Sequence, residues 1–228
     1  SMGGGFFLTH SVPRNLRNKS QRTVLAEPLS LLGLDVLEYP MELFFSEADL
    51  AKAKAVLLKT GIDKKSLVVF SPGALHKTKS WPTNHYARLA DLLSSKKGLK
   101  ICLVGSKQDF PQAQAVEKGC KTKVFDLCDR LSLSETMAII SLSKFFVGND
   151  SGLTHVAAAL GIPVVQIFGP GLPQRFGHFG EHDLVFSDPN CPFHPCSPYV
   201  CKAPAAWCMK RISPETVYDG IEQKGLFP

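Results

Sequence analysis

The sequence predicts an α/β fold built on a doubly wound, mainly parallel sheet. From Leu67 onward, five short apolar runs alternate with four segments in which apolar residues recur at helical spacing. Such alternation favours parallel strands whose connecting helices cover both faces of the sheet. The 228 residues are 44% hydrophobic and 20% charged. This composition fits one sizeable core and excludes bulk disorder or fibrous structure.

Each expected element has a local signal. The strands are apolar runs suited to burial on both faces, at residues 67–71, 100–104, 123–127, 144–147 and 163–168. Between them, helices are expected at residues 82–97, 108–119, from the Ser132–Glu135 capping box onward, and at 151–160. Outside this core, Ser46 should cap a helix over residues 46–58, and Ser213 a C-terminal helix. Residues 28–37 are expected to form a short helix that runs through Gly33 into a strand.

The chain is mildly basic, with 26 Lys and Arg against 20 Asp and Glu and a net charge of +6. This excess suits a phosphorylated ligand or an anionic membrane surface and is diagnostic of neither. Part of it lies in a run that we expect to be a solvated edge: Arg14, Arg17, Lys19 and Arg22. The sequence lacks the long basic arm or interleaved aromatic and basic residues of a nucleic-acid binder, so no nucleic-acid partner is expected.

Three features favour a cytoplasmic protein. No apolar run reaches the roughly 18–20 residues of a membrane-spanning helix, and the longest, residues 156–168, is interrupted by Gly161 and Pro163. The N-terminus lacks the layout of a signal peptide. Seven cysteines, an odd number spread through expected strands and loops, indicate a reducing compartment.

The strongest functional signal follows the fourth strand. Residues 148–155 read Gly-Asn-Asp-Ser-Gly-Leu-Thr-His and lead directly into an apolar helix. Free backbone N–H groups and the helix dipole favour a phosphate at such an end. The hydroxyls of Ser151 and Thr154 and the imidazole of His155 would add donors. A simpler interpretation stays open, in which Asp150 or Ser151 only caps the helix and His155 lies on the surface.

Two further loops lie at the same expected edge of the sheet. After the first strand, the turn Ser71-Pro-Gly-Ala contains Gly73, which permits close backbone approach. Lys79 follows and could neutralise a diphosphate, although loop lysines more often face solvent. After the second strand, Asp109 stands where an acid can hydrogen-bond a ribose hydroxyl, although a helix-capping acid is the more common explanation.

Four cysteines and a histidine gather near the C-terminal end: Cys191, His194, Cys196, Cys201 and Cys208. Thiolates can hold zinc, but the intervals lack the paired Cys-x-x-Cys of a typical zinc site. We therefore expect structural thiols, no stoichiometric metal and no cofactor. No arrangement of histidines marks one of these cysteines as a nucleophile.

Three common motifs are missing from the sequence. They are the Gly-x-Gly-x-x-Gly fingerprint of dinucleotide enzymes, the Gly-x-x-x-x-Gly-Lys-Ser/Thr phosphate loop and the Gly-x-Ser-x-Gly nucleophile elbow. A dehydrogenase is therefore disfavoured.

Taken together, the marked segments resemble the C-terminal, donor-binding domain of the lipopolysaccharide heptosyltransferases, which use ADP-heptose and have the GT-B fold. The resemblance covers about residues 65–220 and rests on five motifs in matching order. They are Ser-Pro-Gly-Ala at 71–74, Lys-Ser-Trp-Pro at 79–82, Asn-Asp-Ser-Gly-Leu-Thr-His at 149–155, Ile-Phe-Gly-Pro at 167–170 and Cys-Met-x-x-Ile-Ser-Pro-Glu at 208–215.

The resemblance implies an inverting, metal-free transfer of a heptose or related sugar from an ADP-sugar to a lipopolysaccharide core acceptor. Lys79 would contact the donor phosphates. The diphosphate and the sugar would be cradled by Ser71, Gly73, Asp150, Ser151, Gly152, Leu153, Thr154 and His155. The hydrogen-bond donors among these residues and the N-terminus of the helix would stabilise the departing nucleoside diphosphate. A cytoplasmic protein in peripheral contact with the inner membrane fits such an acceptor.

Members of that family also carry an N-terminal domain that holds the acceptor site and the proposed carboxylate base. We interpret residues 1–65 as a remnant of that domain with an interdomain connector, and residues 66–228 as the nucleotide-sugar donor-binding domain. We therefore assign no catalytic residue for the base and expect the chain to be inactive alone. Self-association through the surface that the other domain would cover is also expected.

Two alternative functions stay open. One is a non-catalytic module that binds nucleotide diphosphates, and the other is a GT-B-fold sugar epimerase. Glycosyl transfer or donor hydrolysis would distinguish an enzyme from the module. The Lys-Ser-Trp-Pro and cysteine-rich segments favour the heptosyltransferase over the epimerase.

Overall fold

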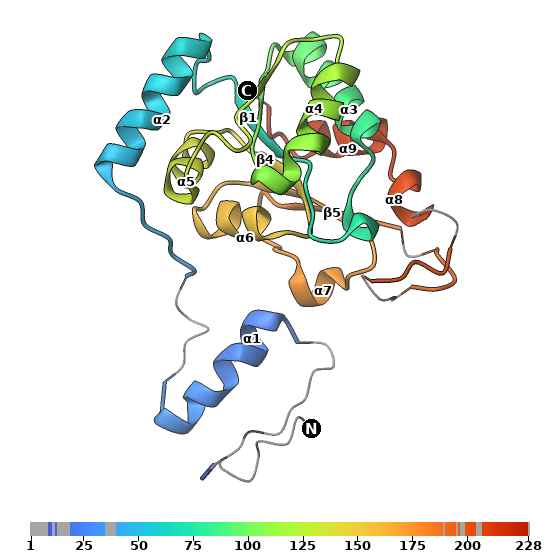
Figure 1. Cartoon of the computed structure of the whole chain (residues 1–228). Coiled ribbons are helices and arrows are strands. Elements are labelled where there is room, and N and C mark those ends of the chain that lie inside the picture. Colours follow the sequence, from blue (N-terminus) through green and yellow to red (C-terminus); the bar gives the residue numbers. More distant parts are fainter. Residues whose placement is uncertain are drawn as a thin grey trace.

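The predicted parallel sheet is present, with one strand more than expected. The computed structural model describes residues 9, 10, 12, 19–34, 40–188, 190–194, 196, 199–203 and 207–227. Within them, six parallel strands pair in the order β3-β2-β1-β4-β5-β6 (Figure 1). The strands are β1 Leu67–Ser71, β2 Lys100–Leu103, β3 Val124–Asp126, β4 Phe146–Asn149, β5 Val164–Phe168 and β6 Leu184–Ser187. The fold class is confirmed.

The sixth strand is the one that the sequence did not predict. β6 pairs with β5 at the edge of the sheet, from Leu184 opposite Val165 to Ser187 opposite Phe168. Its side chains are only half-buried or exposed, whereas every residue of β5 is buried. The segment therefore lacks the long apolar run that marks a central strand.

The predicted helices lie within a few residues of their expected places. They are α2 Glu47–Thr60, α3 Thr83–Lys97, α4 Phe110–Gly119, α5 Leu133–Ser141, α6 Gly152–Ala159 and α9 Pro214–Gln223. The expected serine caps form, since Ser46, Ser132 and Ser213 each accept a backbone N–H of the first turn. The short helices α7 Pro173–Phe176 and α8 Trp207–Arg211 were not predicted.

Helices cover both faces of the sheet and form two cores. Alternate side chains of β1 point to opposite faces and are all fully buried. Val68 and Phe70 belong to the core that includes residues of α3, α4 and α9. Leu67 and Val69 belong to the core formed with α2, α5 and α6. Burial on both faces explains why β1 reads as an unbroken apolar run.

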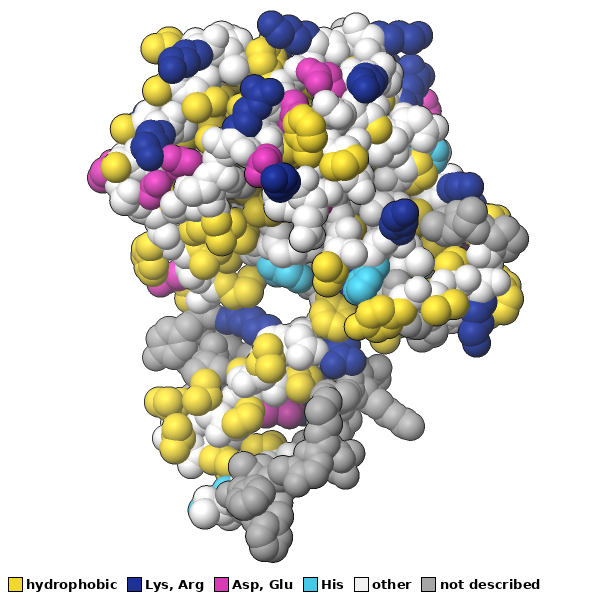
Figure 2. Space-filling view, viewed as in Figure 1, with side chains coloured by type: hydrophobic (Ala, Val, Ile, Leu, Met, Phe, Trp, Pro, Cys, Tyr) yellow, Lys and Arg dark blue, Asp and Glu magenta, His cyan; other side chains and the backbone are white. Residues whose placement is uncertain are grey.

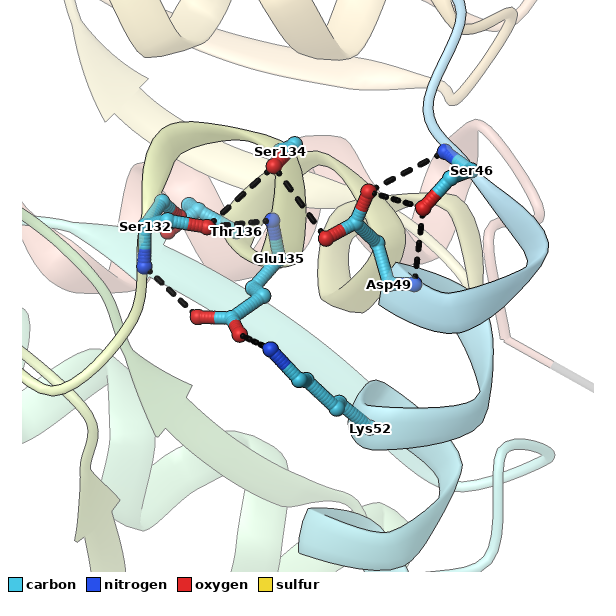
Figure 3. Close-up of polar contacts among 7 residues, drawn as sticks. All are labelled: Ser46, Asp49, Lys52, Ser132, Ser134, Glu135 and Thr136. Carbon is cyan, nitrogen blue, oxygen red and sulfur yellow. Dashed lines mark hydrogen bonds and ion pairs between the residues drawn. The ribbon is translucent and has the colours of Figure 1, made fainter.

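Two capping carboxylates join α2 to α5 (Figure 3). Asp49 caps α2 through Oδ2 and accepts a hydrogen bond from the Ser134 hydroxyl at Oδ1, at 3.2 Å. Glu135 caps α5 through Oε2, and its Oε1 lies 2.8 Å from the ammonium of Lys52. Each carboxylate thus caps the N-terminus of its own helix and accepts a hydrogen bond from a side chain of the neighbouring helix. This contact fixes the N-terminal end of α5, which borders the cavity described below.

The N-terminal part differs from the expectation of a helix at 28–37. A helix α1, Gln21–Ala26, comes first because the Ser20 side chain caps it, and a 3-10 helix, Glu27–Leu32, follows. Residues 35–37 lie outside the described residues. Neither helix contains a buried residue. α1 lies outside the sheet and the helices that cover it (Figure 1), and it contacts α7, where Arg175 Nε donates to Gln21 Oε1 at 3.0 Å.

The basic run near the N-terminus is only partly described. Arg14 and Arg17 lie outside the described residues. Lys19 forms an ion pair with Glu27, and Arg22 lines a cavity, so neither is simply a solvated edge. Among the described helices, none is long and apolar enough to cross a membrane.

Candidate functional site

A cavity of about 690 Å³ opens at the carboxyl ends of the central strands. It extends across β1 and β4, where the strand order reverses, which is the usual ligand position in open parallel sheets. Loops after four strands line it: Ser71, Gly73, Ala74, Leu75 and Lys77 after β1; Gly105, Ser106, Gln108, Asp109 and Gln112 after β2; Leu131, Leu133 and Thr136 after β3; and Ser151, Gly152, Leu153 and Val156 after β4.

The N-terminus of α6 forms one wall of this cavity. Ser151 stands at the N-cap with extended backbone, yet its side chain makes no capping hydrogen bond. Its Oγ is buried without a partner among the described residues. Gly152 follows, and a Cβ added there would meet nothing within 4 Å. A buried hydroxyl beside free backbone N–H groups is an arrangement that an anion can satisfy.

Asn149 ties the loops of this edge together. Its amide nitrogen donates to the carbonyl oxygens of Pro72 and Gly73, both at 3.0 Å. Its Oδ1 accepts the backbone N–H of Trp81 at 3.0 Å. Asn149 is fully buried. The loops after β1 and β4 are therefore held in one geometry by a side chain that was not among the predicted site residues.

Thr154 does not supply the phosphate donor expected from the sequence, and the prediction is wrong for this hydroxyl. Thr154 is 1% exposed, and its Oγ1 donates to the carbonyl oxygen of Asn149 at 2.6 Å. A buried hydroxyl needs such a partner, because an unpaired one would lose its hydration without compensation. The contribution of Thr154 is thus to the shape of the loop.

Lys79 and Asp150 come together from different loops. Lys79 ends the 3-10 helix η3, Lys77–Lys79, after β1, and its Nζ lies 2.5 Å from Oδ2 of Asp150 after β4. The Lys79 side chain is 22% exposed and that of Asp150 is 6% exposed. Asp150 is the residue immediately before Ser151, so this charge pair adjoins the N-terminus of α6.

Asp109 has two roles in the structure. Its Oδ2 accepts the backbone N–H and the hydroxyl of Ser106, which makes it a capping acid. The carboxylate also packs against Gly73, where an added Cβ would lie 1.9 Å from Oδ1. Gly73 is therefore required for contact between two loops. Asp109 still lines the cavity, so a contact with a ribose stays a prediction.

His155 faces a second cavity of about 730 Å³, between α1 and α7. This hollow, with histidine side chains on its upper wall, is visible in Figure 2. His155 Nδ1 lies 2.8 Å from Nε2 of His178. Arg22 and Arg175 also line this cavity. Most of the predicted phosphate and sugar residues line one of these two cavities. The first is lined by Ser71, Gly73, Ser151, Gly152 and Leu153, and the second by His155, whereas Lys79, Asp150 and Thr154 line neither.

Burial lowers the pKa of both histidines in this pair. At His155, the charge of Asp150 opposes the decrease and that of Lys79 adds to it. At His178, the neighbouring His155 lowers the pKa further, and Asp183 opposes this. The lowered pKa values favour the neutral form of both rings, and the 2.8 Å contact fits a hydrogen bond from one imidazole to the other.

The cysteine-rich segment contains no disulfide, because all seven cysteines are free. Among the described residues, no group of three His, Cys, Asp or Glu side chains could hold a metal ion. Cys191 and Cys208 are buried, and burial raises the pKa of the Cys208 and Cys196 thiols, which opposes reactivity. That this segment takes up no stoichiometric metal stays a prediction.

The sheet and the cavity at its edge define the class of protein. A parallel α/β sheet with a cavity at the reversal of strand order, walled by a helix N-terminus, is the geometry of a Rossmann-type nucleotide-binding domain. The chain belongs to glycosyltransferase family 9 (heptosyltransferase), whose sequence profile matches residues 9–206. The resemblance drawn from the motifs is confirmed.

Individual relatives agree with this assignment. Lipooligosaccharide heptosyltransferase 2 of Haemophilus ducreyi is 37% identical over 129 residues, which are 54% of this chain and 37% of that protein. The ADP-heptose lipopolysaccharide heptosyltransferase II of E. coli superposes with a TM-score of 0.65 and 25% identity, over 80% of this chain and 53% of the other. The family 9 glycosyltransferase of Veillonella parvula shares the fold, with a TM-score of 0.81 and 20% identity over 96% and 64% of the two chains. The chain thus spans less than two thirds of each of these proteins.

Proposed function

We propose that this chain is the donor-binding part of a glycosyltransferase that moves a heptose from an ADP-sugar to a lipopolysaccharide core acceptor. Residues 66–228 form the donor-binding domain, and residues 1–65 form a remnant of the N-terminal domain and a connector. Family membership supports the reaction class. The names of the relatives, a lipooligosaccharide heptosyltransferase and an ADP-heptose lipopolysaccharide heptosyltransferase, support the donor and the acceptor.

One observation carries the proposal for donor binding. The buried, unpaired hydroxyl of Ser151 stands at the N-terminus of α6, on the wall of a 690 Å³ cavity at the β1/β4 reversal. We place the nucleoside in the part of this cavity that Asp109 and Ser71 line. The diphosphate would then lie at Ser151, Gly152 and Leu153, with Lys79 and Asp150 beside it. The sugar would extend past α6 toward His155.

The chemistry of this arrangement is assistance to the leaving group. In the transfer, the bond between the sugar C1 and the phosphate oxygen breaks, and an acceptor hydroxyl bonds to C1 through its oxygen and releases its proton. Negative charge then develops on the departing ADP. The α6 N-terminus, the Ser151 hydroxyl and the Lys79 ammonium would bind that charge more strongly as it grows. We assign no general base to the described residues.

Two weaker proposals concern partners. The leucines of the N-terminal helices are strongly exposed, with Leu25 at 70% and Leu32 at 72%. Such a surface would favour self-association when no other domain covers it.

Peripheral contact with the inner membrane is proposed only from the lipid character of the acceptor.

A transfer assay tests the proposed function. ADP-heptose and a heptose-free lipopolysaccharide core acceptor are incubated with the 228-residue chain and with a chain extended at its N-terminus to the length of its relatives. We expect turnover only by the extended chain, because transfer requires the acceptor to be held against the donor carbon. Donor binding without transfer by either chain would favour the non-catalytic module. Comparable turnover by both chains would contradict the proposed division of the site.

A further inference from the structure

His178 is fixed by a buried glutamine of the sheet. Gln166 lies on β5 and is fully buried. Its Oε1 accepts the backbone N–H of His178 at 2.9 Å, and its Nε2 donates to the His178 carbonyl oxygen at 2.8 Å. A single amide thus pairs with both backbone groups of His178. The backbone of this loop residue is therefore held by a buried side chain of the sheet.

The His178 ring is directed at His155. The two rings meet edge to face, at 68° with centroids 5.0 Å apart, and Nε2 of His178 lies 2.8 Å from Nδ1 of His155. The charges of Asp150 and Lys79 act on His155, and that of Asp183 acts on His178. Arg22 and Arg175 line the same cavity. Both histidines line the cavity in which the sugar of the donor is proposed to lie.

A hydrogen bond between two neutral imidazoles has two possible directions. If His155 donates from Nδ1, its Nε2 is a lone pair and can only accept. If His178 donates from Nε2, Nδ1 of His155 accepts, and Nε2 of His155 carries the hydrogen. The proposed ligand carries phosphate oxygens, which only accept, and sugar hydroxyls, which can donate or accept. The second arrangement offers a donor to either group, whereas the first can contact only a hydroxyl.

We propose that His178 is a positioning residue, which donates from Nε2 to Nδ1 of His155 and so holds His155 with Nε2–H directed at the oxygens of a nucleotide-diphosphate sugar. This inference rests on the proposed function, because the ligand sets the direction of the hydrogen bond. Gln166 supports it by fixing the His178 backbone. Loss of the His178 ring nitrogen would leave the His155 ring free to change tautomer and orientation.

The test uses the 228-residue chain and three variants. His178→Phe keeps a ring of similar size without the hydrogen bond, His178→Gln keeps a donor, and His182→Phe is a matched control on an exposed histidine of the same loop region. Nitrogen-15 NMR assigns the tautomer of His155. Calorimetry measures the affinity for ADP-heptose, and thermal denaturation verifies that each variant is folded.

We expect His155 of the unsubstituted chain to carry its hydrogen on Nε2. His178→Phe should mix its tautomers and weaken ADP-heptose binding about tenfold, the effect of one hydrogen bond to a charged ligand. His178→Gln should restore most of the affinity, and His182→Phe should change neither readout.

A hydrogen on Nδ1 of His155 in the unsubstituted chain would overturn the inference even if no variant folds. Equal affinity of a folded His178→Phe variant would also overturn it. Failure of the unsubstituted chain to bind ADP-heptose would instead count against the proposed function, and the tautomer would still test the histidine pair.

Discussion

The ammonium of Lys79 lies 2.5 Å from the carboxylate of Asp150, although 71 residues separate them in the sequence. The pair joins the loops after β1 and β4, which flank the reversal of strand order. The Asp150 side chain is 6% exposed, so removal of Lys79 would leave a buried carboxylate without its cationic partner. Asp150 thereby holds Lys79 in place beside the N-terminus of α6, where we propose that a diphosphate binds.

Replacement of Lys79 should weaken nucleotide binding. Lys79→Met removes a positive charge next to the proposed diphosphate, so we expect a loss of about tenfold to a hundredfold in ADP affinity, as for a hydrogen bond to a charged group. Calorimetry measures this directly. Lys118→Met is the matched control, because Lys118 is exposed on α4 and also loses one charge. An equal loss in both variants would reveal a nonspecific charge effect.

Two glycines at the cavity should respond differently to alanine. Gly73→Ala places a Cβ 1.9 Å from Asp109 Oδ1, so we expect the free energy of unfolding to fall by about 1–3 kcal/mol, as in other overpacked sites. Gly152→Ala meets no atom within 4 Å and should leave stability unchanged. Its methyl group would nevertheless obstruct a phosphate at α6, so ADP affinity should fall. Urea denaturation and calorimetry together separate the two effects. Unchanged ADP affinity in Gly152→Ala would argue against a phosphate at this helix end.

Asn149 should matter for stability more than its small size suggests. Asn149→Ala removes three hydrogen bonds and leaves the N–H of Trp81 and two carbonyl oxygens without that partner. We expect the free energy of unfolding to fall by about 2–4 kcal/mol, given about 1–3 kcal/mol for each unpaired buried group and partial repair by water. Chemical denaturation measures it, with the exposed Asn84→Ala as control. A loss no greater than in the control would show that the loops are held by other contacts.

The histidine pair should make stability depend on pH. Folding lowers the pKa of His155 and His178 below their ordinary value of 6.5, mainly through burial. The unfolded state therefore binds more protons as the pH falls through this range, and stability decreases on acidification. We expect a shallower decrease between pH 7 and pH 5 in the His155→Gln/His178→Gln double variant, measured by denaturation at each pH. His85, whose pKa is also lowered by burial, contributes equally to both proteins. Parallel curves would contradict neutral, buried rings.

Local patterns in the sequence predicted the core of the fold well, because buried strands such as β1 are continuously apolar and helices such as α5 carry a capping box. β6 was missed because its apolar run, Leu-Val-Phe, is short and its side chains are only half-buried at the edge of the sheet. The loop at residues 148–155, where we propose that a diphosphate binds, could be identified as a candidate for a similar reason, because its polar groups are contiguous. The roles of Asn149, Gln166 and His178 depend on partners distant in the sequence or on ring direction, which no local pattern encodes.

Titration of the 228-residue chain with ADP, in parallel with UDP and GDP, tests the central claim most directly. If the cavity at the β1/β4 reversal is the donor site of a family 9 glycosyltransferase, calorimetry should record saturable binding of ADP at one site per chain. Lys79→Met and Gly152→Ala should weaken that binding, and Lys118→Met should not. Absence of binding by all three nucleotides at millimolar concentration would contradict the assignment of this cavity as a nucleotide-sugar site.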